Sequence, residues 1–140
     1  MLHKTLDDYL LRIEQILMAL ENAYIERYEE EILTPQRANL RIRVRFTGGY
    51  LLEINEAIAV DNDVLMWLDY RYHCQDEQNN LIFRYDSTPH FPELSSFPHH
   101  KHLPDEVIAC QKPDIGEVIQ TVSQDNFAII RSRSCLASLV

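Results

Sequence analysis

Hydrophobic residues near the N-terminus recur alternately four and three positions apart, which places them on one face of an α-helix. Thr5 is expected to cap this helix, because Asp7 and Asp8 then fall in its first turn, where the helix dipole favours acids. The helix must end before Pro35. We therefore predict one long helix over residues 5–31. Its apolar stripe consists of Leu6, Leu10, Ile13, Leu17, Leu20 and Tyr24.

From residue 38 onward the hydrophobic period changes to two, which is typical of strands with one buried face. Turn-forming residues, such as the pair Gly48 and Gly49, separate the alternating segments. Consecutive segments of this kind, joined by tight turns, predict an antiparallel meander. The predicted strands cover residues 38–46, 50–60, 64–75 and 81–86, with turns at residues 47–50, 61–63 and 76–80.

Residues 87–105 break both periods and hold four of the six prolines and four of the six histidines. Such a composition favours an ordered loop. Residues 107–113 are interpreted as a fifth strand, and Asp114 as the N-cap of a short helix over residues 115–124. The predicted fold is therefore α+β: a long N-terminal helix, a four- to five-stranded antiparallel meander, a histidine- and proline-rich loop and a short C-terminal helix.

The length of 140 residues suits a single domain over residues 1–140, in which residues 127–140 form an extension or an edge strand. No apolar run approaches the roughly 20 residues of a membrane span. The N-terminus lacks the pattern of a secretory signal, so we expect a cytoplasmic protein without membrane association. The net charge of −9 argues against a protein that coats nucleic acid generally. The scattered Cys74, Cys110 and Cys135 are interpreted as reduced thiols.

The segment from residue 84 to residue 102 concentrates the groups that cleave a phosphodiester. Histidine moves protons near neutral pH, so one histidine can take the proton of an attacking 2′-hydroxyl while a second protonates the leaving oxygen. Arg84 and Lys101 are expected to hold the charge that builds up on phosphorus, and Asp86 to orient a histidine. The candidate catalytic residues are His90, His99, His100, His102, Arg84, Asp86, Lys101 and Tyr85.

Two alternatives compete with this interpretation of the histidines. In a proline-rich loop, histidines also fill polar gaps without any chemical role. In a metal site, His100 and His102 would point both rings to one side of an extended segment, and Asp86 or His90 would complete the ligand set. The spacing matches no standard zinc pattern, so acid/base catalysis without a metal or cofactor is the favoured hypothesis.

Three arginines alternate with apolar residues in the first predicted strand. This stripe suits the phosphates of RNA, and Arg71 of the third predicted strand adds to it. The alternative is a solvated face whose arginines pair with acids across the hairpin, such as Glu53 and Glu56. The candidate RNA-binding residues are Arg41, Arg43, Arg45 and Arg71.

The run FRYDSTPHFPELSSFPHHKH, residues 83–102, resembles the hallmark of the TumE family of small toxin–antitoxin proteins. The strand with residues 70–73 and the glycine hairpin ahead of a leucine-rich return strand are similar as well. The resemblance covers residues 4 to about 124. One departure is Phe91, where the family pattern has a second histidine after His90, and it weakens any role for a histidine pair there. The matching residues are Arg84, Tyr85, Asp86, Pro89, His90, Pro92, Leu94, Phe97, Pro98, His99, His100, Lys101 and His102.

The resemblance implies a toxin that a cognate antitoxin neutralises, often a helix-turn-helix DNA-binding protein. The family is likened to RelE-like ribonucleases, which have helices followed by an antiparallel sheet. Together with the candidate residues, it favours an endoribonuclease that cleaves RNA by metal-independent acid/base catalysis. A non-catalytic module that binds a partner protein is the alternative, and the formation of a homodimer is left open.

Overall fold

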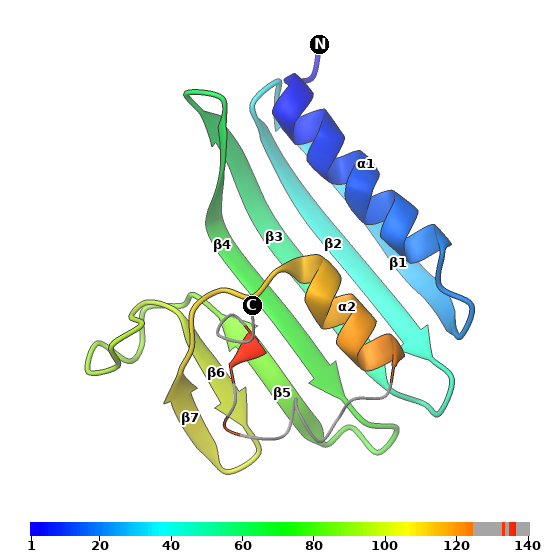
Figure 1. Ribbon diagram of the computed structural model, residues 1–140, viewed down its shortest axis with the longest axis vertical. Helices are drawn as coiled ribbons and strands as arrows, with labels where there is room; N and C mark the ends of the chain where they lie inside the picture. Colours follow the sequence, from blue (N-terminus) through cyan, green and yellow to red (C-terminus); the bar gives the residue numbers. More distant parts are fainter. Residues whose placement is uncertain (125–132, 134, 137–140) are drawn as a thin grey trace.

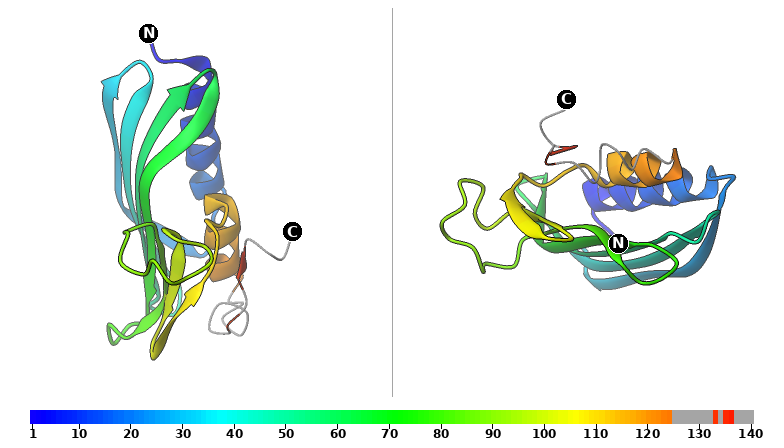
Figure 2. Two further views of the ribbon diagram at one scale, coloured as in Figure 1. Left: turned by 90° about the vertical axis from the view of Figure 1, so that its left-hand side faces the viewer. Right: turned by 90° about the horizontal axis from the view of Figure 1, so that it is seen from below.

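The computed structural model of the chain describes residues 1–124, 133, 135 and 136. Over these residues the fold is α+β, with a seven-stranded antiparallel meander whose strands follow sequence order (Figure 1). Both helices lie on the same face of the sheet (Figure 2). The elements are α1 (Lys4–Met18), β1 (Ala23–Thr34), β2 (Arg37–Phe46), β3 (Leu51–Asp61), β4 (Val64–Gln75), β5 (Leu81–Asp86), β6 (His100–Leu103), β7 (Glu106–Ala109) and α2 (Ile115–Ser123).

The predicted helix over residues 5–31 is wrong beyond Met18, because the second part of this range forms strand β1. This segment is rich in tyrosine and isoleucine, which favour strands. Its glutamates also gain partners on β2, where Glu29 lies opposite Arg41. Tyr24, expected on the helical stripe, is exposed instead. The stripe residues that are buried as predicted are Leu6, Leu10, Ile13 and Leu17.

The predicted meander is confirmed in type, but seven strands replace the four to five that were expected. Strands β2 to β5 match their predicted ranges to within one residue. Strand β6 lies inside the predicted loop over residues 87–105, which leaves residues 87–99 as the connection between β5 and β6. Strand β7 is shorter than the fifth strand predicted over residues 107–113 and begins one residue earlier.

The helix caps agree with the sequence at one helix and differ at the other. The N-cap of α1 is His3 and not Thr5, because Nδ1 of His3 accepts a hydrogen bond from the Thr5 backbone N–H at 3.1 Å. The N-cap of α2 is Asp114 as predicted, and its carboxylate accepts from the Glu117 N–H at 3.2 Å. Asp114 also pairs with Arg12 of α1 at 3.2 Å, which joins the two helices. Neither helix of the described chain is long and apolar enough to cross a membrane.

Alternation along the strands divides the side chains between two faces of the sheet. One face packs against the helices and forms the core, with Leu40, Ile42 and Val44 of β2 fully buried. We call the other face, which carries no helix, the open face (Figure 2). Across it, cross-strand neighbours form one row from β2 to β6 that consists of Arg41, Asn55, Arg71, Asp86 and His100.

A buried carboxylate joins α1 to the sheet. Glu56 is 3% exposed and accepts hydrogen bonds from the hydroxyl of Tyr9 at 2.5 Å, from Nε1 of Trp67 at 3.0 Å and from the hydroxyl of Tyr72. Burial raises the pKa of Glu56, although these three donors oppose the rise. Glu56 therefore faces the core, and the interpretation that it pairs with the arginines of the stripe is wrong.

The cysteines differ from the expectation of three reduced thiols. Cys110 and Cys135 form a disulfide with a Cα–Cα distance of 5.5 Å, while Cys74 is a buried thiol. The two bonded cysteines are 25 residues apart, a spacing that matches no motif, so only the fold reveals that they meet. The extension predicted over residues 127–140 otherwise lies outside the described residues, apart from Arg133 and Leu136.

We predict that Glu56→Ala lowers the free energy of unfolding by roughly 2–4 kcal/mol, because it leaves three core donors without their shared acceptor. The control is Glu53→Ala on the same strand, which removes only a half-exposed ion pair with Arg43 on the open face. That variant should change the free energy by less than about 1 kcal/mol. Urea denaturation followed by circular dichroism measures both, and equal losses would contradict the role given to Glu56.

Candidate functional site

The pairing of β5 with β6 brings the two ends of the histidine segment together. Asp86 lies opposite His100, and Arg84 lies opposite His102. Because alternate residues of a strand share a face, all four side chains lie on the open face. The loop over residues 87–99 connects the two strands, so groups 14 or more positions apart in the sequence become direct neighbours.

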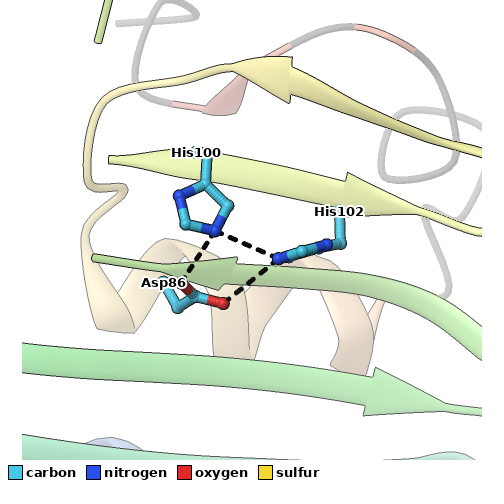
Figure 3. Close-up of side chains that lie close together, drawn as sticks. All are labelled: Asp86, His100 and His102. Carbon is cyan, nitrogen blue, oxygen red and sulfur yellow. Dashed lines mark hydrogen bonds and ion pairs between the residues drawn. The ribbon is translucent and has the colours of Figure 1, made fainter. Parts of the chain in front are cut away.

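Asp86, His100 and His102 form a compact group that we call the Asp–His–His cluster (Figure 3). Nε2 of His100 lies 2.8 Å from Oδ1 of Asp86, and Nε2 of His102 lies 3.4 Å from Oδ2. The two Nε2 atoms are 3.0 Å apart. Nδ1 of His100 lies 3.0 Å from the carbonyl oxygen of Pro98. Since a carbonyl only accepts, this contact fixes a hydrogen on Nδ1 of His100.

The surroundings of Asp86 keep it ionised. Burial opposes its ionisation, but the hydrogen bond from His102 and the charge of His100 outweigh burial and hold the pKa of Asp86 below its usual range. The backbone N–H of Thr88 also donates to Oδ1 of Asp86 at 3.0 Å. An ionised Asp86 favours the His102 tautomer with its hydrogen on Nε2, which leaves Nδ1 as a proton acceptor.

His102 is the member of the cluster that solvent reaches. Its side chain is 25% exposed, whereas the side chains of His100 and Asp86 are 1% and 6% exposed. Among the described residues, Nδ1 of His102 has no hydrogen-bond partner, since the contacts of this ring are made by Nε2. The imidazole of His102 is therefore accessible to a ligand, while the buried Asp86 and His100 hold this imidazole in place.

Phe91 forms an apolar wall beside the cluster. Its ring centroid lies 4.9 Å from that of His100 and 5.9 Å from that of His102, with both contacts edge to face. This is the position at which the family resemblance predicts a second histidine. The aromatic ring reduces the access of water to the imidazoles, which strengthens their interaction with Asp86.

A cavity of ≈ 360 Å³ lies on the open face next to the cluster. Arg41 and Arg71 line it, and among the described residues neither side chain forms an ion pair within 4.0 Å, although Glu29 of β1 lies opposite Arg41. Arg71 lies directly opposite Asp86, and Thr88, which binds Asp86 through its N–H, is also part of the lining. The cavity therefore adjoins the cluster through Arg71 and Thr88, although no residue of the cluster lines it. Further residues of the lining are Asn39, Asn55, Ala57 and Asp69.

The other two arginines of the stripe are neutralised by acids. Nε of Arg43 lies 2.8 Å from Glu26, and its Nη1 lies 3.1 Å from Glu53. Nε of Arg45 lies 3.3 Å from the same Glu26. Pairing across the strands, the alternative considered for the stripe, therefore holds for Arg43 and Arg45. Of the four candidate RNA-binding residues, the structure places Arg41 and Arg71 at the cavity.

Lys101 and Tyr85 lie on the face opposite to the cluster, because each alternates with residues of the open face. Lys101 is fully buried, and its ammonium group lies 5.3 Å from the centroid of the Tyr85 ring. Burial lowers the pKa of Lys101 to about 8. Arg84 stays on the open face, where its Nε donates to Nδ1 of His73 at 3.2 Å. The structure thus brings Arg84 to the cluster but not Lys101 or Tyr85.

The other two candidate histidines, His99 and His90, do not belong to the Asp–His–His cluster. The hydroxyl of Tyr70 lies 2.9 Å from Nδ1 of His99, and burial lowers the pKa of His99. Because Tyr70 belongs to the core, His99 points away from the cluster. His90 is exposed on the loop, and its ring centroid lies 6.4 Å from that of Phe91. His90 therefore follows the loop next to Phe91 and makes no contact with the cluster among the described residues.

Several residues of the open face were not among the candidates. His73 lies between Glu53 and Arg84 in the strand pairing, and Asn55 and Asp69 line the cavity. A signal for two of them is present in the sequence, since the alternation over residues 64–75 places Asp69 and His73 on one strand face with Arg71. That this face meets the histidine segment depends on strand pairing, which the local pattern does not specify.

The Asp–His–His cluster also offers three donor atoms for a metal ion, all within 4.8 Å of one another. The separation of 3.0 Å between the two Nε2 atoms is close to the edge of roughly 3.3 Å expected for tetrahedral zinc with nitrogen and oxygen ligands, and each Nε2 lies near a different oxygen of Asp86. The Pro98 carbonyl that orients His100 is the kind of partner that supports metal-binding histidines. His90, part of the predicted ligand set, does not belong to this group.

A protein-family model described as Toxin TumE matches residues 13–133, which is most of the chain. Comparisons with curated proteins and with solved structures gave no match. The matched range contains the Asp–His–His cluster, the loop over residues 87–99 and the cavity. The match confirms the resemblance carried by the histidine segment, and the chain therefore belongs to the TumE toxin family.

Proposed function

We propose that this chain is the toxin of a toxin–antitoxin pair and that it cleaves RNA as an endoribonuclease at the Asp–His–His cluster. One observation carries the proposal: a buried carboxylate holds a partly exposed imidazole beside a cavity lined by two arginines, on a face that no helix covers. Membership in a toxin family supports the toxin role and implies an antitoxin partner.

The proposed reaction is an internal transesterification of the RNA backbone. The 2′-oxygen attacks the adjacent phosphorus, the bond from phosphorus to the 5′-oxygen breaks, and the products are a 2′,3′-cyclic phosphate and a 5′-hydroxyl. Nδ1 of His102 takes the proton of the 2′-hydroxyl, and Asp86 stabilises the imidazolium that forms. We assign the proton for the leaving oxygen to His90, which is exposed on the adjoining loop. No metal or cofactor takes part.

Two arginines are placed to hold the charge that develops on phosphorus. Arg84 lies opposite His102 on the neighbouring strand, and Arg71 lies opposite Asp86. Guanidinium groups donate two parallel hydrogen bonds to phosphate oxygens, so both suit the scissile phosphate. Stabilisation of developing charge by such fixed donors is commonly the largest contribution to catalysis.

A metal-dependent hydrolase is the second candidate, and the convergence of three donor atoms in the cluster favours it. Charge argues for the acid/base mechanism instead. The cluster holds a single carboxylate, and Arg71 and Arg84 occupy the cross-strand positions beside it. Their positive charge disfavours a divalent cation at this place and favours an anionic phosphate.

The proposed partner is an antitoxin, of the helix-turn-helix class that the family resemblance implies. An antitoxin that covers the open face would exclude RNA from the cavity, so binding alone would neutralise the toxin. The proposed site of action is the cytoplasm, and the mechanism needs no second copy of the chain.

We predict that His102→Ala relieves the growth arrest caused by expressing the chain without its antitoxin. RNA cleavage by the purified variant should fall by roughly 10²–10⁴-fold, the usual contribution of a general base. The control is His3→Asn, because asparagine at the cap of α1 keeps an acceptor for the first turn. Cell growth after induction and the rate of cleavage of a labelled RNA measure the two effects, and circular dichroism checks that both variants fold.

Full toxicity of His102→Ala would contradict the catalytic assignment. Cleavage that stops in the presence of a chelator and returns with Zn²⁺ would instead favour the metal-dependent candidate. A stable complex with the antitoxin, together with no RNA cleavage at any pH, would favour the non-catalytic binding module.

We further predict that Arg71→Ala weakens RNA binding more than Arg43→Ala. Arg71 has no carboxylate partner among the described residues, whereas Arg43 is paired with Glu26 and Glu53. Loss of one phosphate contact to single-stranded RNA should reduce the slope of log K against log salt by about 0.7. Fluorescence anisotropy at several salt concentrations measures this slope, and equal effects of the two variants would show that the ion pairs do not decide which arginine binds RNA.

A further inference from the structure

The cavity on the open face has a small residue at its floor. Ala57 of β3 has Asn39 and Asp69 as its neighbours on the two adjoining strands. Its methyl group leaves the space between these two polar side chains unfilled. Strands β2 and β4 are two strand spacings apart, about 9.6 Å. The cavity of ≈ 360 Å³ therefore has room for one flat nucleobase between Asn39 and Asp69.

The polar groups around this space are divided into acceptors and donors. Oδ1 of Asp69 accepts from the hydroxyl of Ser87 at 3.1 Å, which holds the carboxylate in place. The amide nitrogen of Asn39 donates to Glu31 at 3.0 Å, so its carbonyl oxygen is left as an acceptor. Arg41 offers only donors. A ligand that fits this space must carry two donors on one edge and acceptors on another.

Guanine meets this requirement. Its N1–H and N2–H₂ groups are adjacent donors that one carboxylate accepts as a bidentate pair. Its O6 and N7 atoms are the acceptors that arginine contacts most often. Adenine and cytosine present a donor beside an acceptor on the corresponding edge, and uracil presents one donor between two acceptors. Each of these bases would place an acceptor against the carboxylate of Asp69.

We propose that the cavity binds a guanine base of the RNA substrate, with Asp69 contacting its N1 and N2 edge and Arg41 its O6 and N7 edge. This inference rests on the proposed function for the choice of RNA as the ligand, and it adds the base that the site selects. Arg71 lines the same cavity and lies opposite Asp86, so the bound guanosine is next to the scissile phosphate.

The test compares binding of the four ribonucleoside 5′-monophosphates to the intact chain by isothermal titration calorimetry. All four carry the same phosphate, so differences report the base. GMP should bind at least about tenfold tighter than AMP, CMP or UMP, the range expected for one good bidentate pair. Asp69→Asn keeps an acceptor for Ser87 but replaces the second acceptor with a donor, so GMP should fall to within about twofold of AMP. The control is Asp61→Asn, an exposed residue at the end of β3, which should keep the preference.

Equal binding of the four nucleotides by the unaltered chain would overturn the inference, and so would a guanine preference that survives in Asp69→Asn. Mapping of the cut positions in a mixed-sequence RNA tests the proposed function separately. Cleavage without any preference for guanosine would overturn the inference and leave the endoribonuclease proposal standing. Selective binding of GMP without any cleavage would overturn the endoribonuclease proposal and support the base site.

Discussion

The pairing of β5 with β6 is the constraint on which the candidate site depends. It places Asp86 opposite His100, and a slip of one residue would turn both histidines toward the core and Lys101 toward the open face. The register is held from the other side of the sheet, where Tyr85 and Lys101 lie opposite each other and are fully buried. Packing on the helix-covered face therefore determines which side chains of β5 and β6 lie on the open face.

Most of the strands follow from the sequence because burial of one face imposes a period of two, as residues 38–46 and 64–75 show. Strand β1 does not, because its tyrosines and glutamates are stabilised by β2, a partner that the local pattern does not reveal. The candidate site is limited in the same way, because its residues come together only through strand pairing. The sequence indicates Asp86 and the histidines because they are concentrated in one segment. The same segment also suggested Lys101, which the alternation along β6 places on the opposite face. The cavity, built from three further strands, required the strand order.

The net charge of the whole chain does not describe the local charge of the open face around the cavity. The net charge is −9, yet the row across the open face has Arg41 and Arg71, whose side chains form no close ion pair within the described residues. Strand β1 explains part of this, since its Glu26 neutralises both Arg43 and Arg45. Charges separated by more than a Debye length, about 8 Å at physiological salt, are largely screened. A charged ligand at the cavity would therefore be influenced mainly by the charged residues of its lining, such as Arg41, Arg71 and Asp69.

A comparison of the two buried carboxylates supports the placement of the chemistry. Glu56 accepts from two tyrosine hydroxyls and an indole N–H, and burial raises the pKa of Tyr72 far above its ordinary value. Such donors keep their protons at neutral pH, so Glu56 joins helix and sheet and does no more. Asp86 instead binds two imidazoles, the side chains that most often serve as general acids and bases. The groups around each carboxylate, and not its burial, therefore separate the structural role of Glu56 from the chemical role proposed for Asp86, which lies opposite Arg71 and binds two imidazoles.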